Sequence, residues 1–417
     1  MPHTMSAIMN VPQVDVAQLQ NRDLAAWTQL LREVLAVDDV VVTAVTAEAL
    51  RTVANAPYDH PVSRYHLTLE NHTDTISFIG KHTNRLEALF YQECDWDFPH
   101  LAPPCHYLHL SEKDGWLVLA DIPNDFPAEI WTPTHVEQLI EQLADLHTVY
   151  WQQTKKLSRL GVPHFVMGEQ TSGQELAAQH AIYFDQGPAA VLSDHAIHHA
   201  GRLAGTFLKA ANGLTVMRSL GGWPGILGES HLTAVADLLD DPVPMLEPLK
   251  NLPATLLHGN PHSHHWRLTL FGDSYLLDWH QAMIGPGVLD LVSFVEQFDL
   301  LFANGDSSRL LVRQERPLSD ETMIDSYLLT MSSRLGSKFD GRALRRAIPA
   351  ARCLHVLTNW LPHFASWFSQ MPNTYTWQKI NRLTDAQLAE TPYRAIVPFR
   401  PYLAGVFHRF LQSYKTL

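Results

Sequence analysis

The residues best suited to chemistry lie between Leu256 and Leu291, in the stretch LLHGNPHSHHWRLTLFGDSYLLDWHQAMIGPGVLDL. It begins with an apolar run, passes through a polar loop rich in histidine and continues as two apolar runs separated by Gly272-Asp273-Ser274. This pattern predicts a loop, a strand, a tight turn and a second strand. Asp278 and Asp290 lie at the edges of these apolar runs. A carboxylate at the edge of a buried element is costly without a partner, so both positions predict a metal, a cation or a hydrogen-bond network.

Histidines are frequent around Asp278 in the sequence: His258, His262, His264, His265 and His280. Neutral imidazole is a common ligand of zinc and manganese, so a histidine-rich metal-dependent hydrolase is one interpretation. The spacing is not that of a closed zinc site, because His264 and His265 are adjacent and point apart on an extended chain. A second interpretation is that His265 and Asp278 together hold one divalent cation, with a preference shifted from magnesium toward manganese or zinc.

The stretch resembles the aminoglycoside phosphotransferase and choline kinase-like family, which are small-molecule kinases of the protein-kinase fold. The catalytic segment of that family reads H-G-D-x-H-x-x-N and is followed by a hairpin, a metal-binding D-W and a closing D-L. The matching positions here are His258, Gly259, His262, Asp278-Trp279 and Asp290-Leu291. The resemblance implies an ATP-dependent phosphotransferase that acts on a hydroxyl group of a small molecule and uses Mg²⁺ or Mn²⁺.

Two positions depart from the family pattern. Asn260 stands where the family has its catalytic aspartate, and His265 stands where it has an asparagine that helps to hold the second metal. The resemblance therefore implies a catalytic loop made of Asn260, His262 and His258, with Asp278 and His265 as metal ligands. An amide can orient a substrate hydroxyl but cannot accept its proton, and a general base contributes about 10²–10⁴-fold to rate. A slow kinase, a kinase with His262 or His264 as a relay, another nucleotide chemistry and a pseudokinase all stay open.

The N-terminal part predicts a helix followed by a small antiparallel sheet. Apolar residues recur at helical spacing over 25–35, and the strands are expected at 40–45, around 65–69 and around 76–81. Lys81 ends the last of these strands, and the segment 84–93 predicts the next helix. In the family resembled, a lysine of this strand contacts the nucleotide phosphates and pairs with a glutamate of the following helix. Lys81 and Glu87 are the candidates, with Glu93 as a substitute partner.

The remaining elements of a nucleotide site are weaker in sequence. The segment 47–59, where the family covers the phosphates, contains no glycine. Trp116–Leu119 predicts a strand that ends at 120–123, where the family has the hinge that binds adenine through backbone groups, so Asp121 is placed beside the nucleotide. A long helix is expected from Thr132 or Thr134 to about Tyr150. His147 on that helix is interpreted as a buried, hydrogen-bonded residue.

Length and composition set the broader frame. A chain of 417 residues, 46% of them apolar, is longer than a single compact core normally accommodates, so two lobes are expected. The prediction is an α+β, bilobal protein-kinase-like fold, with an antiparallel N-lobe over residues 1–119 and a mostly helical C-lobe over residues 120–417 that contains the segment 256–291.

Charge and cysteine content narrow the partners. A net charge of −13 argues against nucleic acid or an anionic membrane as a partner. Three widely spaced cysteines indicate reduced thiols. The sequence shows neither a signal segment nor a membrane-spanning run, so a cytoplasmic location is expected. It identifies neither the small-molecule substrate nor the oligomeric state.

Overall fold

The computed structural model describes residues 14–50, 61–71, 75–98, 100–112, 114–168, 192–302, 310–313, 315–368, 374–391, 394, 397 and 399–417. The chain divides into two compact units. The first consists of Met1–Ile130, His264–Ala282 and Phe302–Arg309, and the second of Trp131–Ser263, Met283–Leu301 and Leu310–Leu417. The hairpin that carries Asp278 therefore belongs to the same unit as the N-terminal residues.

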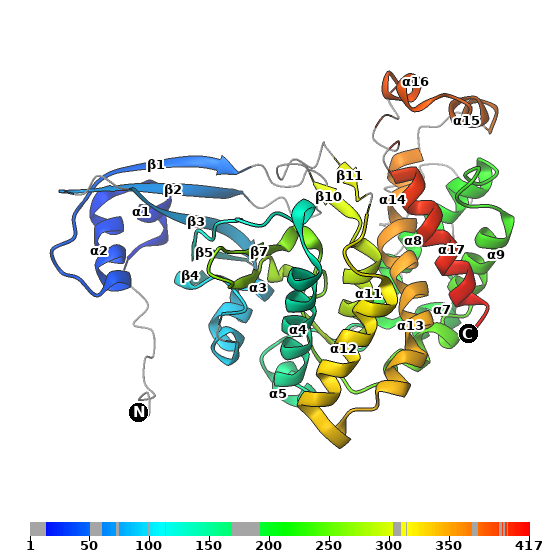
Figure 1. Ribbon diagram of the computed structural model, residues 1–417, viewed down its shortest axis with the longest axis horizontal. Helices are drawn as coiled ribbons and strands as arrows, with labels where there is room; N and C mark the ends of the chain where they lie inside the picture. Colours follow the sequence, from blue (N-terminus) through cyan, green and yellow to red (C-terminus); the bar gives the residue numbers. More distant parts are fainter. Residues whose placement is uncertain are drawn as a thin grey trace. The chain divides into compact units, whose positions relative to one another are not determined.

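The first unit is built on a five-stranded antiparallel sheet with the strand order β1-β2-β3-β5-β4 (Figure 1). Its strands are β1 (Val42–Leu50), β2 (Val62–Leu69), β3 (Thr75–Asn84), β4 (Cys105–Leu110) and β5 (Asp114–Ala120). The predicted small antiparallel sheet is confirmed. Its register places Arg64, Ile79 and Leu119 opposite one another across three strands.

Two helices, α1 (Val16–Gln20) and α2 (Leu24–Leu35), precede the sheet. Asp23 caps α2 by accepting a hydrogen bond from the Ala26 backbone N–H at 2.8 Å. The buried residues of α2 recur at helical spacing, and the Trp27 ring lies 5.0 Å from that of Tyr65 on β2. Burying this apolar face against the sheet stabilises both, and the helix predicted over 25–35 is confirmed.

The segment after β3 turns into a helix without an intervening loop. Asn84 ends β3 and caps α3 (Arg85–Leu89), its side chain accepting a hydrogen bond from the Glu87 backbone N–H at 3.0 Å. A turn of π-helix, η1 (Phe90–Cys94), and a turn of 3₁₀-helix, η2 (Asp95–Asp97), follow. The helix predicted over 84–93 is thus confirmed, but it is an α-helix only as far as Leu89 and continues as a π-helix from Phe90.

The predicted hairpin is also confirmed. Strands β7 (Trp266–Leu268) and β8 (Ser274–Leu276) pair antiparallel, and Gly272 adopts a φ of 85°, which glycine reaches without steric cost. Asp278 then takes a left-handed conformation with φ 73° and ψ 61°, and a 3₁₀ turn, η6 (Trp279–Gln281), follows. Aspartate is one of the few residues with side chains that tolerate this region, which turns the chain sharply after β8.

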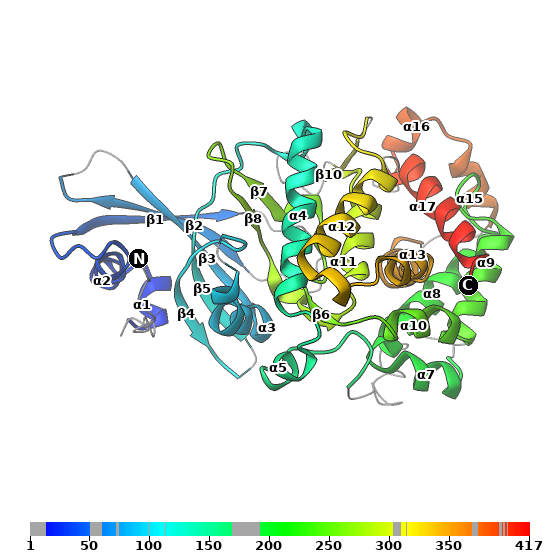
Figure 2. The ribbon, with the colours of Figure 1, turned by 60° about the horizontal axis from the view of Figure 1, so that its bottom comes forward.

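The second unit is mostly helical (Figure 1, Figure 2). Its helices from the first half are α4 (Pro133–Val149), α5 (Thr154–Arg159), α7 (Asp194–Ala200), α8 (Ala204–Ser219), α9 (Glu229–Asp240) and α10 (Val243–Lys250). Those from the second half are α11 (Val288–Gln297), α12 (Asp320–Leu335), α13 (Gly341–His355), the π-helix η9 (Val356–Trp360), α14 (Leu361–Phe368), α15 (Thr374–Asn381), α16 (Asp385–Ala389) and α17 (Phe399–Tyr414). The short strands are β6 (Thr255–Leu257), β9 (Met283–Gly285), β10 (Leu300–Phe302) and β11 (Leu310–Val312). An antiparallel sheet followed by a large helical part confirms the predicted α+β fold class.

Helices of this unit pack side by side, α12 along α4 and α14 along α8. Thr132 caps α4, and Pro133 occupies its first turn, which decides between the two predicted starts of that helix. Among the described residues, no helix is both long enough and apolar enough to cross a bilayer.

Candidate functional site

Lys81 is the centre of an ion-pair cluster in the first unit. Its ammonium Nζ donates to Glu87 Oε1 at 2.8 Å and also to Asp278. Only 14% of its side chain is exposed. Burial by itself would lower the pKa of Lys81, but the negative charges of Asp278 and Glu87 outweigh it and raise that pKa above its usual range. The lysine is therefore a fixed positive charge between two carboxylates.

Glu87 is fully buried and has several partners besides Lys81. Its Oε2 accepts a hydrogen bond from the Thr83 hydroxyl, and its Oε1 accepts one from the Trp279 backbone N–H at 3.2 Å. Glu93, the substitute partner considered from sequence, is exposed and accepts a hydrogen bond from Gln92 Nε2 at 2.9 Å. The structure therefore pairs Lys81 with Glu87.

Asp278 is flanked by two imidazoles. His280 Nδ1 lies 2.9 Å from Oδ1 of the carboxylate, and His265 Nε2 lies 3.4 Å from Oδ2. Burial raises the pKa of Asp278, but the charge of Lys81, the hydrogen bond from His280 and the charge of His265 together hold it well below its usual range. The carboxylate is ionised at neutral pH, and 30% of its side chain stays exposed, so an external ligand can reach it.

The donors around Asp278 fit a divalent cation only in part. Asp278 Oδ2 and His265 Nε2 are a carboxylate oxygen and an imidazole nitrogen lying side by side, and both are cation ligands. No group of three or more His, Cys, Asp or Glu side chains suited to a metal ion occurs among the described residues. These two donors suit a cation that completes its shell with phosphate oxygens and water, as Mg²⁺ does at nucleotide sites. They are two donors, whereas catalytic zinc sites usually have three protein ligands, and the metal-hydrolase interpretation stays a prediction.

The surrounding frame fixes this cluster. The Phe90 and Trp279 rings stack with centroids 3.7 Å apart and an interplanar angle of 6°, which joins the helical segment after Glu87 to the residue after Asp278. Asn84 Nδ2 donates to the His280 backbone carbonyl at 2.8 Å. The end of β3 and the helical segment after it are thus tied to the two residues that follow Asp278.

Asp121 lies directly after β5, as predicted, but its carboxylate is engaged. Arg64 Nε donates to Oδ2 at 2.6 Å and Nη2 donates to Oδ1 at 3.3 Å. The sheet register explains the pair, because Arg64 and Leu119 lie on one row and Asp121 is two residues further on the same face. Any contact of this segment with a nucleotide would fall to its backbone groups.

The predicted catalytic residues His258, Asn260 and His262 lie in the second unit, where Asp290 holds the turn that begins at His258. Asp290, buried at 1% exposure, accepts hydrogen bonds from the backbone N–H groups of His258 at 2.7 Å and Gly259 at 2.9 Å. Its Oδ2 lies 3.3 Å from His147 Nε2, and His147 Nδ1 lies 2.7 Å from the Tyr327 hydroxyl. The interpretation of His147 as a buried, hydrogen-bonded residue is confirmed.

Asn260 follows this anchored turn. Its Oδ1 accepts a hydrogen bond from Gln297 Nε2 at 3.3 Å, and its carbonyl accepts one from the His262 backbone N–H at 2.7 Å. His262 is buried. His264, in the first unit, has its pKa lowered to about 3 by burial and by the charges of His265 and Arg267. Such a weakly basic imidazole is a poor proton acceptor, which argues against His264 as a relay.

The sequence did not predict three contacts of the cluster around Lys81. These are the hydrogen bond of Thr83 to Glu87, the capping of α3 by Asn84 and the contact of His280 with Asp278. A signal for Asn84 was present, because Asn84-Arg85-Leu86-Glu87 has a capping residue three positions before a glutamate. No local pattern marks Thr83 or His280 as partners of Glu87 and Asp278. Most of the predicted phosphate-covering segment 47–59 lies outside the described residues, since 51–60 are not among them.

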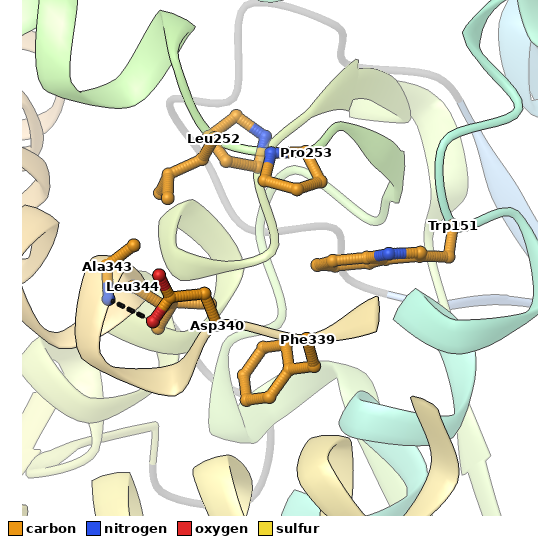
Figure 3. Close-up of a pocket in the computed structure, with 8 residues that line it drawn as sticks. Trp151, Leu252, Pro253, Phe339, Asp340, Ala343 and Leu344 are labelled. Atoms are coloured by element: carbon orange, nitrogen blue, oxygen red, sulfur yellow. Dashed lines mark hydrogen bonds between the residues drawn. The ribbon is translucent and has the colours of Figure 1, made fainter. Parts of the chain in front are cut away.

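A small pocket of about 20 Å³ in the second unit holds none of the predicted site residues (Figure 3). Trp151, Pro253 and Phe339 face it, and the Asp340 carboxylate beside it accepts a hydrogen bond from the Ala343 backbone N–H at 2.9 Å. A volume of this order suits about one water molecule. The pocket is therefore no candidate for a nucleotide.

No protein-family model matches the sequence, and no curated protein matches it significantly. Solved structures similar to this chain include three kinases or phosphotransferases. A choline kinase from Cryptosporidium parvum Iowa II has 9% identity, covers 89% of each chain and gives a TM-score of 0.45. A macrolide 2'-phosphotransferase from Brachybacterium faecium has 12% identity, covers 82% of this chain and 98% of its own, and gives 0.40. A spectinomycin phosphotransferase in complex with ADP and spectinomycin has 13% identity, covers 87% and 93%, and gives 0.37. TM-scores below 0.5 carry no argument about activity, which must come from this chain's own residues.

Proposed function

We propose that this protein binds a purine nucleotide, ATP in the first place, together with Mg²⁺ or Mn²⁺, and transfers a phosphoryl group to a hydroxyl of a small molecule. The observation that carries the proposal is Lys81, which is held as a buried positive charge between Glu87 and Asp278. The kinase-like sequence motifs around Asp278 support the same function.

The charges of the cluster suit a phosphate-bearing ligand with a cation. One ammonium and two carboxylates leave a net charge of −1 before the two imidazoles are counted. That balance favours the binding of a divalent cation next to Asp278 and His265. With the cation bound, the site gains the positive charge that offsets the phosphate oxygens during transfer. Lys81 would then turn part of its hydrogen bonding from Asp278 to the nucleotide phosphates.

The role proposed for the loop at Asn260 is to position the hydroxyl group that accepts the phosphoryl group. The Asn260 amide can orient this hydroxyl by hydrogen bonding but cannot remove its proton. In a loose phosphoryl-transfer transition state, positioning and charge neutralisation supply most of the acceleration, so turnover without a strong base is slow rather than absent. His262 is the remaining side chain proposed as a relay.

A second function is favoured by one observation. Asn260 Oδ1 already accepts a hydrogen bond from Gln297 Nε2, so the amide is held in a neutral network where the resembled family has a carboxylate. A pseudokinase that binds nucleotide without transfer would have this arrangement. Both functions share the nucleotide site at Lys81 and differ only in turnover.

Two measurements on the purified chain test the proposal. The first is thermal unfolding with ATP or GTP in the presence of Mg²⁺ or Mn²⁺, because a ligand that binds only the folded state raises the melting temperature. The second is ATP consumption with both metals. A shift with turnover supports the transferase, and a shift without turnover supports the pseudokinase. Both functions are rejected if no nucleotide and metal raise the melting temperature at a nucleotide concentration about 100 times the dissociation constant expected of a cellular ligand.

A further inference from the structure

A second group of histidines lies in the second unit, on α7. This helix has the sequence DHAIHHA and carries His195, His198 and His199. His195 and His199 are four residues apart, which places them on one face of the helix. Their ring centroids are 4.5 Å apart, and the planes of the rings are inclined by 55°. Two imidazoles at this spacing can bind the same metal ion, as the paired histidines of helical zinc motifs do.

One of the two imidazoles is oriented by a carboxylate. Asp241, the residue after α9, has its Oδ1 3.0 Å from His195 Nε2. When Nε2–H donates this hydrogen bond, the lone pair of the ring resides on Nδ1, which is then the nitrogen able to bind a metal. A carboxylate behind a histidine is the arrangement that fixes the tautomer of metal-binding imidazoles and raises their basicity.

A lysine lies beside the second imidazole. Lys250 donates to the His199 backbone carbonyl at 3.2 Å, and its charge opposes a bound cation. The Asp241 carboxylate and the negative end of the α7 dipole act in the opposite direction.

We propose that His195 and His199 form a two-imidazole site for a divalent transition-metal ion such as Zn²⁺ or Ni²⁺, with Asp241 as a residue that positions His195. Water completes the coordination shell. The site is exposed and has two protein ligands, so it exchanges its metal readily. It is independent of the nucleotide site proposed at Lys81.

The test is calorimetric titration of the untagged, full-length chain with Zn²⁺ and with Ni²⁺, in parallel with four variants. His199→Ala removes one ligand and is expected to lower the binding stoichiometry by one ion. Asp241→Asn is expected to weaken the same step by about 10–100-fold, the usual effect of removing an orienting carboxylate. His198→Ala is the matched control on the same helix and is expected to bind as the native chain does. Asp278→Ala reports separately on ions bound at the candidate nucleotide site.

Melting curves without metal show whether each variant is folded. The proposal is rejected if His199→Ala retains the native stoichiometry, or if His198→Ala loses as much binding as His199→Ala. If His199→Ala has a lowered melting temperature, His199→Gln takes its place, because glutamine preserves size and polarity but cannot supply the imidazole.

Discussion

Lys81 Nζ and Glu87 Oε1 lie 2.8 Å apart although only five residues separate the two in sequence. The short connection works because β3 runs as far as Asn84 and Asn84 itself caps α3. Glu87 is then the third residue of the helix and points back toward the strand. A single turn of helix is enough to bring the carboxylate to the lysine.

Removing the lysine should destabilise the protein strongly. In Lys81→Met, Glu87 is left fully buried without its cation, and breaking a buried pair from one side costs about 3–5 kcal/mol. Urea unfolding of this variant measures the change in the free energy of unfolding. Lys155→Met, at an exposed position, is the control and should stay within about 0.5 kcal/mol of the native chain. Equal unfolding of Lys81→Met and the native protein would contradict the assigned role of the ion pair.

Thr83 is expected to act as a positioning residue for Glu87. In Thr83→Val the hydroxyl that donates to Oε2 is lost, and a hydrogen bond to a charged group contributes about 1.5–3 kcal/mol. Unfolding should show a loss of that order, and the nucleotide dissociation constant should rise because Lys81 is less well held. Thr43→Val removes an exposed hydroxyl on β1 that donates to the Thr68 carbonyl at 3.1 Å, so it serves as the control. If the nucleotide dissociation constant rises as much in Thr43→Val as in Thr83→Val, Thr83 has no specific role.

Asp290 should be essential for the turn at His258 and Gly259. Its two oxygens accept hydrogen bonds from both backbone N–H groups. Asp290→Asn replaces one acceptor oxygen by a donor that faces an N–H group, so we expect a loss of about 2–4 kcal/mol. Hydrogen exchange of the His258 and Gly259 amides should accelerate at the same time. Asp240→Asn, exposed at the end of α9, should change neither measurement.

Asp95 should make stability depend on pH. Burial raises the pKa of this carboxyl to about 7, so between its unfolded pKa and about 7 the folded state binds more protons than the unfolded state. Stability from this group is therefore present at low pH and is lost as the pH rises through that window. Asp95→Asn should remove the dependence and raise stability above pH 7 by about 4 kcal/mol, because each unit of pKa shift corresponds to about 1.4 kcal/mol. Urea unfolding across the range tests this, with the exposed Asp97→Asn as control. The assignment is contradicted if the free energy of unfolding of the native chain, relative to that of Asp95→Asn, stays constant or rises as the pH increases to about 7.

The two departures in the kinase-like motif should respond as a pair. If phosphoryl transfer is the native reaction, Asn260→Asp together with His265→Asn supplies a base and a magnesium ligand and should raise ATP turnover, by up to the ~10²–10⁴-fold that a general base provides. If the native residues serve another reaction, the double change should abolish it. Residues that act as a unit are not additive, so both single variants are measured as well. A double variant equal to the native chain in nucleotide binding and turnover would exclude a functional role of the loop.

Local pattern was enough to predict much of the fold. Alternation of apolar residues predicted the strands β2 and β3, helical spacing predicted α2 and α4, and Gly272 with its polar neighbours predicted the β7–β8 hairpin. These features depend on contacts between residues close in sequence, or on which face of an element is buried. His147 was interpreted as a structural residue on other grounds, because the segment 143–151 resembles a helix of the kinase-like family.

The partners of each charged side chain were decided by tertiary structure. Sequence left Glu87 and Glu93 as alternatives, and the choice depended on β3 running to Asn84, which caps α3 and makes Glu87 the third residue of that helix. Asp121 was expected at a nucleotide, but strand pairing of β2, β3 and β5 brings Arg64 to its carboxylate. His280 meets Asp278 because the chain turns through a left-handed residue. Sequence alone therefore determined which residues could carry charge and where the chain would turn. Which charges meet is set by the register of strands distant in sequence, because an ion pair depends on separations of a few ångströms that only the packed fold fixes.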